Sequence, residues 1–110
     1  MKAASASRSL SDFLTSYRPA LVILTGSLSN GSNNRFASMG YAVSGATTVA
    51  ASDTQAYIVK NGTGSNTVQG SATFYVIGLT AGSNTFTAKY RVDAGTGTFA
   101  NRTIVVIPLP

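Results

Sequence analysis

The sequence predicts an all-β fold, and three stretches in its C-terminal half carry that prediction. Residues 85–92 alternate strictly between apolar and polar side chains, which is the period of a half-buried strand. Residues 81–84, Ala-Gly-Ser-Asn, are rich in turn formers and are predicted to join two antiparallel strands. Residues 103–107 form a nearly continuous β-branched run, which suits a strand buried on both faces.

Strand and turn signals also punctuate the rest of the chain after Pro19. Further strands are predicted from short apolar or alternating runs, namely residues 19–27, 36–43, 47–50, 55–60 and 72–80. The Asn-Gly pair at residues 30–31 and the glycine-rich residues 61–66 predict loops. About eight short strands at this spacing favour an antiparallel, jelly-roll-like β-sandwich.

The first 18 residues are predicted to form an N-terminal arm, separate from a sandwich domain at residues 19–110. Leu10, Phe13, Leu14 and Tyr17 follow the spacing of one helical face, and Pro19 then ends the helix. In one interpretation this short helix packs on its own domain. In the other it is a docking arm, because aromatic side chains serve well as anchors in interfaces.

The docking interpretation assigns a role to each charged and apolar residue of the arm. Phe13 and Tyr17 would be the anchors, with Leu10 and Leu14 beside them on the same helical face. Lys2, Arg8 and Arg18 would supply charges that steer the arm toward an acidic surface.

Composition and charge limit the class of partner. The chain has 110 residues, enough for one domain, and a formal net charge of +5 from eight Lys and Arg against three acidic residues. Such an excess favours acidic partners. The basic residues are scattered and no nucleic-acid motif is present, so specific nucleic-acid binding is not predicted. The apolar runs are far shorter than the roughly 20 residues that span a bilayer, so no membrane contact is predicted.

The chemistry of the side chains argues against an enzyme. The chain contains no His, Cys or Glu, and its carboxylates are Asp12, Asp53 and Asp93, which lie in the arm and in predicted turns. No oxygen-ligand loop for a metal and no phosphate-binding glycine motif is present. The sequence therefore predicts no catalytic residue, no metal and no cofactor.

Two segments resemble a known group of proteins. Residues 78–92 (GLTAGSNTFTAKYRV) and 97–109 (GTFANRTIVVIPL) are similar to the C-terminal half of small β-sandwich proteins of tailed bacteriophages. Those proteins in turn resemble trimeric jelly rolls of the tumour necrosis factor and complement-globular type. The resemblance covers about residues 36–109.

The resemblance implies a setting and a task. It implies a homotrimer in which Tyr41, Phe86 and Tyr90 pack near the threefold axis. We expect a virion structural protein on the outer capsid surface, where it decorates and stabilises the shell by binding the major capsid protein. The alternative is a receptor- or glycan-binding module of a phage tail or head appendage. In that case loops 28–34 and 61–66, with Tyr57 or Tyr75, would contact a host surface glycan.

Overall fold

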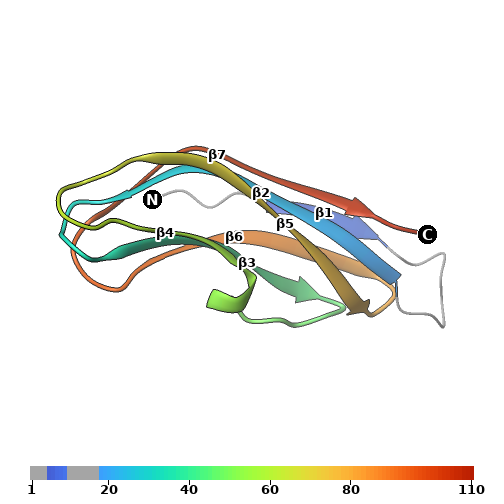
Figure 1. The fold of residues 1–110 in the computed structure, drawn as a ribbon. Helices are drawn as coiled ribbons and strands as arrows, with labels where there is room; N and C mark the ends of the chain where they lie inside the picture. Colours follow the sequence, from blue (N-terminus) through green and yellow to red (C-terminus); the bar gives the residue numbers. More distant parts are fainter. Residues whose placement is uncertain (1–4, 10–17) are drawn as a thin grey trace.

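The fold is all-β, as predicted, and consists of two antiparallel sheets packed face to face (Figure 1). The structure is a computed structural model that describes residues 5–9 and 18–110, the former as backbone alone. The strands are β1 (Ser5–Ser9), β2 (Arg18–Asn30), β3 (Phe36–Gly45), β4 (Ala56–Lys60), β5 (Val68–Leu79), β6 (Ser83–Val92) and β7 (Gly97–Pro108). A short 3-10 helix, η1 (Asp53–Gln55), precedes β4.

The strands divide into a four-stranded and a three-stranded sheet. The first has the order β1-β6-β3-β4 and the second the order β5-β2-β7, with every neighbouring pair antiparallel. In Figure 1 the two sheets form two elongated layers, with η1 on the outer side of the four-stranded sheet. The described residues thus contain fewer strands than the eight or so that were predicted.

Alternating side chains explain why these segments form strands with one buried face. In β6, Phe86 and Ala88 are buried while Lys89 and Arg91 are exposed, which confirms the predicted alternation. In β2, Ala20, Val22 and Leu24 alternate with half-buried residues in the same way. Because β2 pairs with β5 on one edge and β7 on the other, its backbone is fully within the sheet.

Three predictions about individual elements were wrong. Residues 81–84 do not form a hairpin, because β5 and β6 lie in different sheets. Turn formers signal a chain reversal but not whether the flanking strands pair. Residues 103–107 are buried on one face alone, since Val105 and Ile107 are exposed. Residues 47–50 contribute a single bridge, between Val43 and Val49, rather than a strand.

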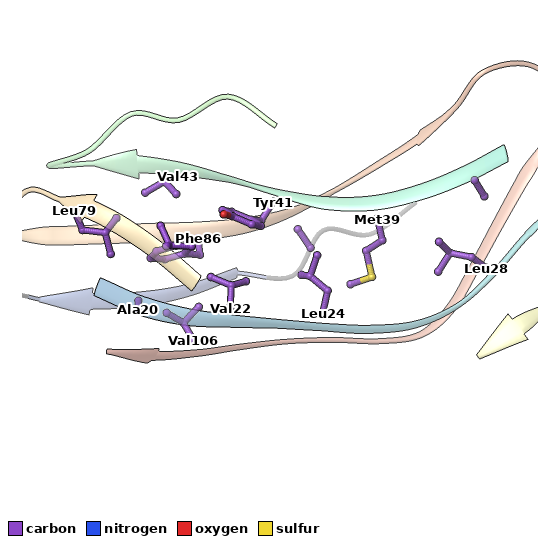
Figure 2. Packing of buried hydrophobic residues seen from close by; sticks show 13 residues of the cluster. Ala20, Val22, Leu24, Leu28, Met39, Tyr41, Val43, Leu79, Phe86 and Val106 are labelled. Carbon is purple, nitrogen blue, oxygen red and sulfur yellow. The ribbon is translucent and has the colours of Figure 1, made fainter. Parts of the chain in front are cut away.

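The core lies between the two sheets and is mainly apolar; the hydroxyl of Tyr41 and the buried side chain of Asn84 in β6 are polar. Figure 2 shows Val22 and Leu24 of β2 facing Tyr41 and Met39 of β3, with Phe86 of β6 in the same layer. The Tyr41 ring lies 5.9 Å from the Phe74 ring and 6.0 Å from the Phe86 ring, centroid to centroid. Tilted aromatic pairs at this distance stabilise a fold by more than the burial of their apolar surface alone would.

A bulge in β7 bends the edge of the three-stranded sheet. The register with β2 shifts between Thr25 and Ser27, and Asn101 has a φ of 51°. Asparagine is one of the few residues that tolerate this left-handed conformation. The backbone of the bulge therefore explains why an asparagine occupies position 101 in the Phe-Ala-Asn-Arg segment. Such a bulge discourages uncontrolled pairing along an exposed sheet edge.

Substitution of Tyr41 separates the packing of its ring from the effect of its hydroxyl. We expect Tyr41→Ala to lower the free energy of unfolding by about 3–5 kcal/mol, because it empties a filled core. Tyr41→Phe keeps the ring and removes a buried hydroxyl that has no hydrogen-bond partner among the described residues. It should be neutral or stabilising by about 1 kcal/mol. Urea unfolding followed by circular dichroism measures both, and a strongly destabilised Tyr41→Phe would contradict this account of the core.

Candidate functional site

The outer face of the four-stranded sheet gathers basic side chains. Lys60 of β4 stands opposite Phe36 of β3, while Lys89 and Arg91 of β6 stand opposite Gly40 and Ser38 of β3. Residues paired across an antiparallel ladder share a face, so these three exposed cations lie together on one side of the sheet. We call Lys60, Lys89 and Arg91 the basic face.

A hollow of about 410 Å³ opens on this basic face. Small residues of β3 form its floor, and the segment leading into η1 forms one wall. The lining residues are Ser38, Gly40, Ala51, Ser52, Asp53, Ala56, Lys89, Tyr90 and Arg91. A Cβ atom at Gly40 would lie 3.2 Å from the carbonyl oxygen of Gln55, so the absence of a side chain there lets the wall approach the floor.

Two of the charged groups in the hollow neutralise each other. Arg91 forms an ion pair with Asp53, and its Nε donates a hydrogen bond to Asp53 Oδ1 at 3.3 Å. The Arg91 guanidinium also lies 4.8 Å from the centre of the Phe36 ring. Because both members of the ion pair are about half exposed, it contributes roughly 0–1 kcal/mol. Lys89 lies beside this pair and is exposed.

The hollow does not bring together the parts of a nucleophilic site. Ser52 caps η1: its Oγ accepts a hydrogen bond from the amide of Thr54 and lies 2.9 Å from the Thr54 hydroxyl. Asp53 is held by Arg91 rather than by the serine. Within the described residues, two cations and one carboxylate around a shallow hollow are suited to contact acidic groups, not to activate a hydroxyl.

Two buried asparagines hold the loops together at one end of the sandwich. Asn61 Nδ2 donates to the carbonyl oxygens of Asn30 and Ser32 at 2.9 and 2.8 Å, and lies 2.6 Å from that of Gly64. Asn30 Nδ2 donates to the carbonyl oxygens of Phe36 and Ala94 at 3.0 and 2.7 Å. These bonds join the β2–β3, β4–β5 and β6–β7 connections, and we call Asn30 and Asn61 the amide clamp.

Asp93 reinforces the same end of the molecule. Its Oδ1 accepts hydrogen bonds from the backbone amides of Phe36 and Ala94, both at 2.9 Å. The Arg35 guanidinium lies 3.7 Å from Oδ2. The hydrogen bond from Phe36, helped by that from Ala94 and by the charge of Arg35, lowers the pKa of the Asp93 carboxyl.

The residues predicted for contacts between copies lie mainly in the core. Tyr41 and Phe86 are each 1% exposed, so they pack within one copy and offer no side-chain surface to a second. Tyr90 is half-buried, with its ring 5.1 Å from that of Phe99 and the Arg102 guanidinium 5.2 Å from its centre. An alternating strand shows which residues share a face, but not whether that face meets the other sheet or another molecule.

The docking-arm residues are described in part. Arg8 belongs to β1, where it stands opposite Asn84 of β6, and Arg18 is the first residue of β2, opposite Leu79. Residues 5–9 thus pair with the sandwich as an edge strand. The expected helix, with Leu10, Phe13, Leu14 and Tyr17, lies outside the described residues, as does Lys2.

The tyrosines expected to contact a glycan have different surroundings. Tyr57 is half-buried against the core, and its hydroxyl donates to the Val68 carbonyl at 3.3 Å. Tyr75 is exposed, but on β5 it lies seven residues from the loop end, roughly 23 Å at the rise of an antiparallel strand. The loops at residues 28–34 and 61–66 do lie together, because the amide clamp joins them.

Along the described part of the chain, no cluster of three or more His, Cys, Asp or Glu could hold a metal ion. No helix there has the length and apolar character needed to cross a membrane. No family model, curated protein or solved structure matches the chain.

Removal of one clamp amide should loosen the loop end. We expect Asn61→Ala to lower the free energy of unfolding by about 2–3 kcal/mol, because it leaves buried carbonyl groups without donors. Asn66→Ala, at an exposed position of the same loop, is the matched control and should change stability by less than about 0.5 kcal/mol. Equal unfolding midpoints in urea for the two variants would contradict the role assigned to the clamp.

Asp93 should make stability depend on pH. A carboxyl whose pKa is lower in the folded state stabilises the fold above its ordinary pKa, and this stabilisation is lost as the pH falls through that value toward the folded one. Between about pH 6 and about pH 2.5, we therefore expect the wild type to lose more stability than Asp93→Asn. Urea unfolding at both pH values measures the difference. The same loss in both proteins would show that the hydrogen bonds at Asp93 do not favour its charged form.

Proposed function

We propose that the protein is a virion structural protein that decorates and stabilises a bacteriophage capsid, bound to the major capsid protein on its outer surface as a homotrimer. The observation that carries this proposal is the basic face. Its cations are gathered on one side of a rigid sheet, and a shell with an acidic exterior would attract that side. The resemblance of residues 78–92 and 97–109 to small phage β-sandwich proteins supports the setting.

The order of the described strands supports a jelly roll. An eight-stranded jelly roll is built from two Greek keys, and its antiparallel strand pairs are nested along the chain. The innermost pair is formed by consecutive strands, and each further pair is formed by the strands that flank it. Here β3 pairs with β4, β2 with β5, and β1 with β6, so that each pair encloses the previous one along the chain. Within this scheme β7 is the strand whose partner would precede β1. The described strands therefore match the last seven of the eight.

Binding through several joined copies would give a higher affinity for the capsid than binding through a single copy. Exposed charges contribute little individually, so a single copy is expected to bind a capsid weakly. Copies joined to one another bind with avidity, because the second contact is made within an already tethered assembly. A protein that binds the assembled shell and not free subunits stabilises the shell by mass action.

The clustered loops favour the alternative, a receptor- or glycan-binding module of a tail or head appendage. The loops at residues 28–34 and 61–66 form one polar end of the sandwich, as loops that recognise ligands commonly do. The buried amides of Asn30 and Asn61 bind backbone carbonyls, however. Recognition would therefore depend on exposed neighbours such as Ser65 and Asn66.

Copy number on the particle separates the two functions. Mass spectrometry of purified virions should find hundreds of copies, and cryo-electron microscopy should place them in symmetric clusters over the shell with the basic face toward it. A few copies confined to a tail tip or vertex would overturn decoration and favour the appendage module. Absence from the particle would overturn both.

Charge substitutions test the proposed docking face. At low salt we expect Lys89→Gln to weaken binding to undecorated particles severalfold, and high salt should reduce this difference. Arg35→Gln removes the same charge from the loop end, where Arg35 lies near Asp93, and is the control. Co-sedimentation with particles measures both. Equal binding by Lys89→Gln and the wild type would exclude the basic face from the contact.

A further inference from the structure

The outer face of the three-stranded sheet is apolar and uncovered. Tyr75 is 64% exposed, Ile77 70%, Val105 45% and Ile107 41%, and all four point away from the core. Surface-exposed residues of this size are ordinary when scattered, but a contiguous group marks an interaction site.

The strand register shows that these exposed apolar side chains lie side by side on one surface. Leu21 of the central strand β2 stands opposite Tyr75 of β5 on one side and Ile107 of β7 on the other. Two residues along β2, Ile23 stands opposite Val105. Paired residues share a face of the sheet, so Tyr75, Leu21 and Ile107 form one apolar row across all three strands. In the next row Ile23 and Val105 are apolar, while β5 contributes Thr73. We call Leu21, Ile23, Tyr75, Ile77, Val105 and Ile107 the apolar face.

Charge distinguishes this face from the opposite side of the molecule. The outward positions along residues 21–27, 71–77 and 103–107 carry no Lys, Arg, Asp or Glu, although the whole chain has a net charge of +5. The cations of the basic face lie on the other sheet. An acidic partner therefore finds nothing to pair with here, whereas two positively charged copies can approach through this face with the least repulsion.

The whole outer surface of the three-stranded sheet is large enough for a contact between copies. Strands of 12 and 13 residues span about 40 Å, and three of them make a surface about 14 Å wide, or roughly 550 Å² in projection. The apolar face supplies six of the eleven outward positions at residues 21–27, 71–77 and 103–107, and the others are Ser or Thr. Two such sheet surfaces stacked together would remove on the order of 1,100 Å² or more from water. Specific interfaces begin at about this value.

We propose that the apolar face is the contact between copies of this chain. The simplest arrangement stacks two sheets about a two-fold axis parallel to the strands. It places β5 of one copy over β7 of the other, so that Tyr75 faces Ile107 across the interface. Aligned stacking of this kind is the ordinary way in which two sheets pack. The serine and threonine residues beside the apolar face, on the same side of the sheet, then meet their counterparts.

This inference bears on the homo-oligomer of the proposed function, because it names a surface that joins copies and replaces the buried Tyr41 and Phe86 in that role. The two-fold stack joins copies in pairs, where the proposed function has three copies. It does not depend on which surface the assembly decorates. The test therefore uses purified protein without particles, whereas the capsid proposal is tested on virions, so the two can fail separately.

Three lysine substitutions test the contact. Ile77→Lys and Ile107→Lys place a charge in the apolar face. Ile58→Lys is the matched control, because Ile58 is 42% exposed on the outer face of the other sheet, close to the 41% of Ile107. Light scattering after size exclusion gives the mass of each protein, and circular dichroism confirms that each is folded.

The wild type and Ile58→Lys should have twice the 11.3 kDa mass of the chain at tens of micromolar. Ile77→Lys and Ile107→Lys should be folded monomers, with dissociation constants raised at least about a hundredfold, because each buries two lysines per pair of copies. A monomeric wild type would overturn the proposal. So would folded Ile77→Lys and Ile107→Lys variants that keep the wild-type mass.

Discussion

The burial of the inner row of β2 is the constraint on which the rest of the structure depends. Ala20, Val22, Leu24 and Leu28 are buried against the other sheet, and the same strand supplies the backbone to which both β5 and β7 are bonded. Without that row, the three-stranded sheet would have neither a core face nor a central strand. The position of the apolar face follows directly, because the residues between these four, such as Leu21 and Ile23, must point outward.

The two sides of the sandwich consequently have different characters. One sheet presents the basic face and a small hollow, and the other presents an uncharged apolar face. Alternation makes this separation possible, since each strand carries two independent sets of side chains. In β6 the inner set builds the core with Phe86 while the outer set carries Lys89 and Arg91. Stability and the proposed recognition can therefore depend on different residues of the same strand.

The sequence was sufficient to predict the fold class and most strands, but not how the strands meet. Alternation in residues 85–92 correctly predicted a strand with Phe86 and Ala88 on its buried face. The β-branched run at residues 103–107 predicts a doubly buried strand, but apolar character alone does not reveal whether a second layer covers the outer face. The turn formers at residues 81–84 predict a hairpin, but a turn signal is the same for a reversal within one sheet and a crossing between two.

The candidate sites were harder to predict for the same reason. The basic face joins residues of β4 and β6 that are 29 or more positions apart, and the charges look scattered until β3 brings their strands together. The Asn-Gly pair at residues 61–62 signalled a loop correctly. Nothing local indicated that the Asn61 amide would be buried and bonded to the carbonyl of Asn30, 31 residues away.

The amide clamp also bears on how the protein ages chemically. Asn-Gly is the dipeptide most prone to deamidation, since the glycine amide nitrogen can attack the preceding side-chain carbonyl, and the two Asn-Gly pairs in this chain are those of Asn30 and Asn61. Folding buries both side chains, and the amide of Gly31 donates its hydrogen bond to Thr96 instead. Covalent damage at these sites should therefore proceed mainly from opened molecules. The accumulated deamidation would record how often the loop end has opened.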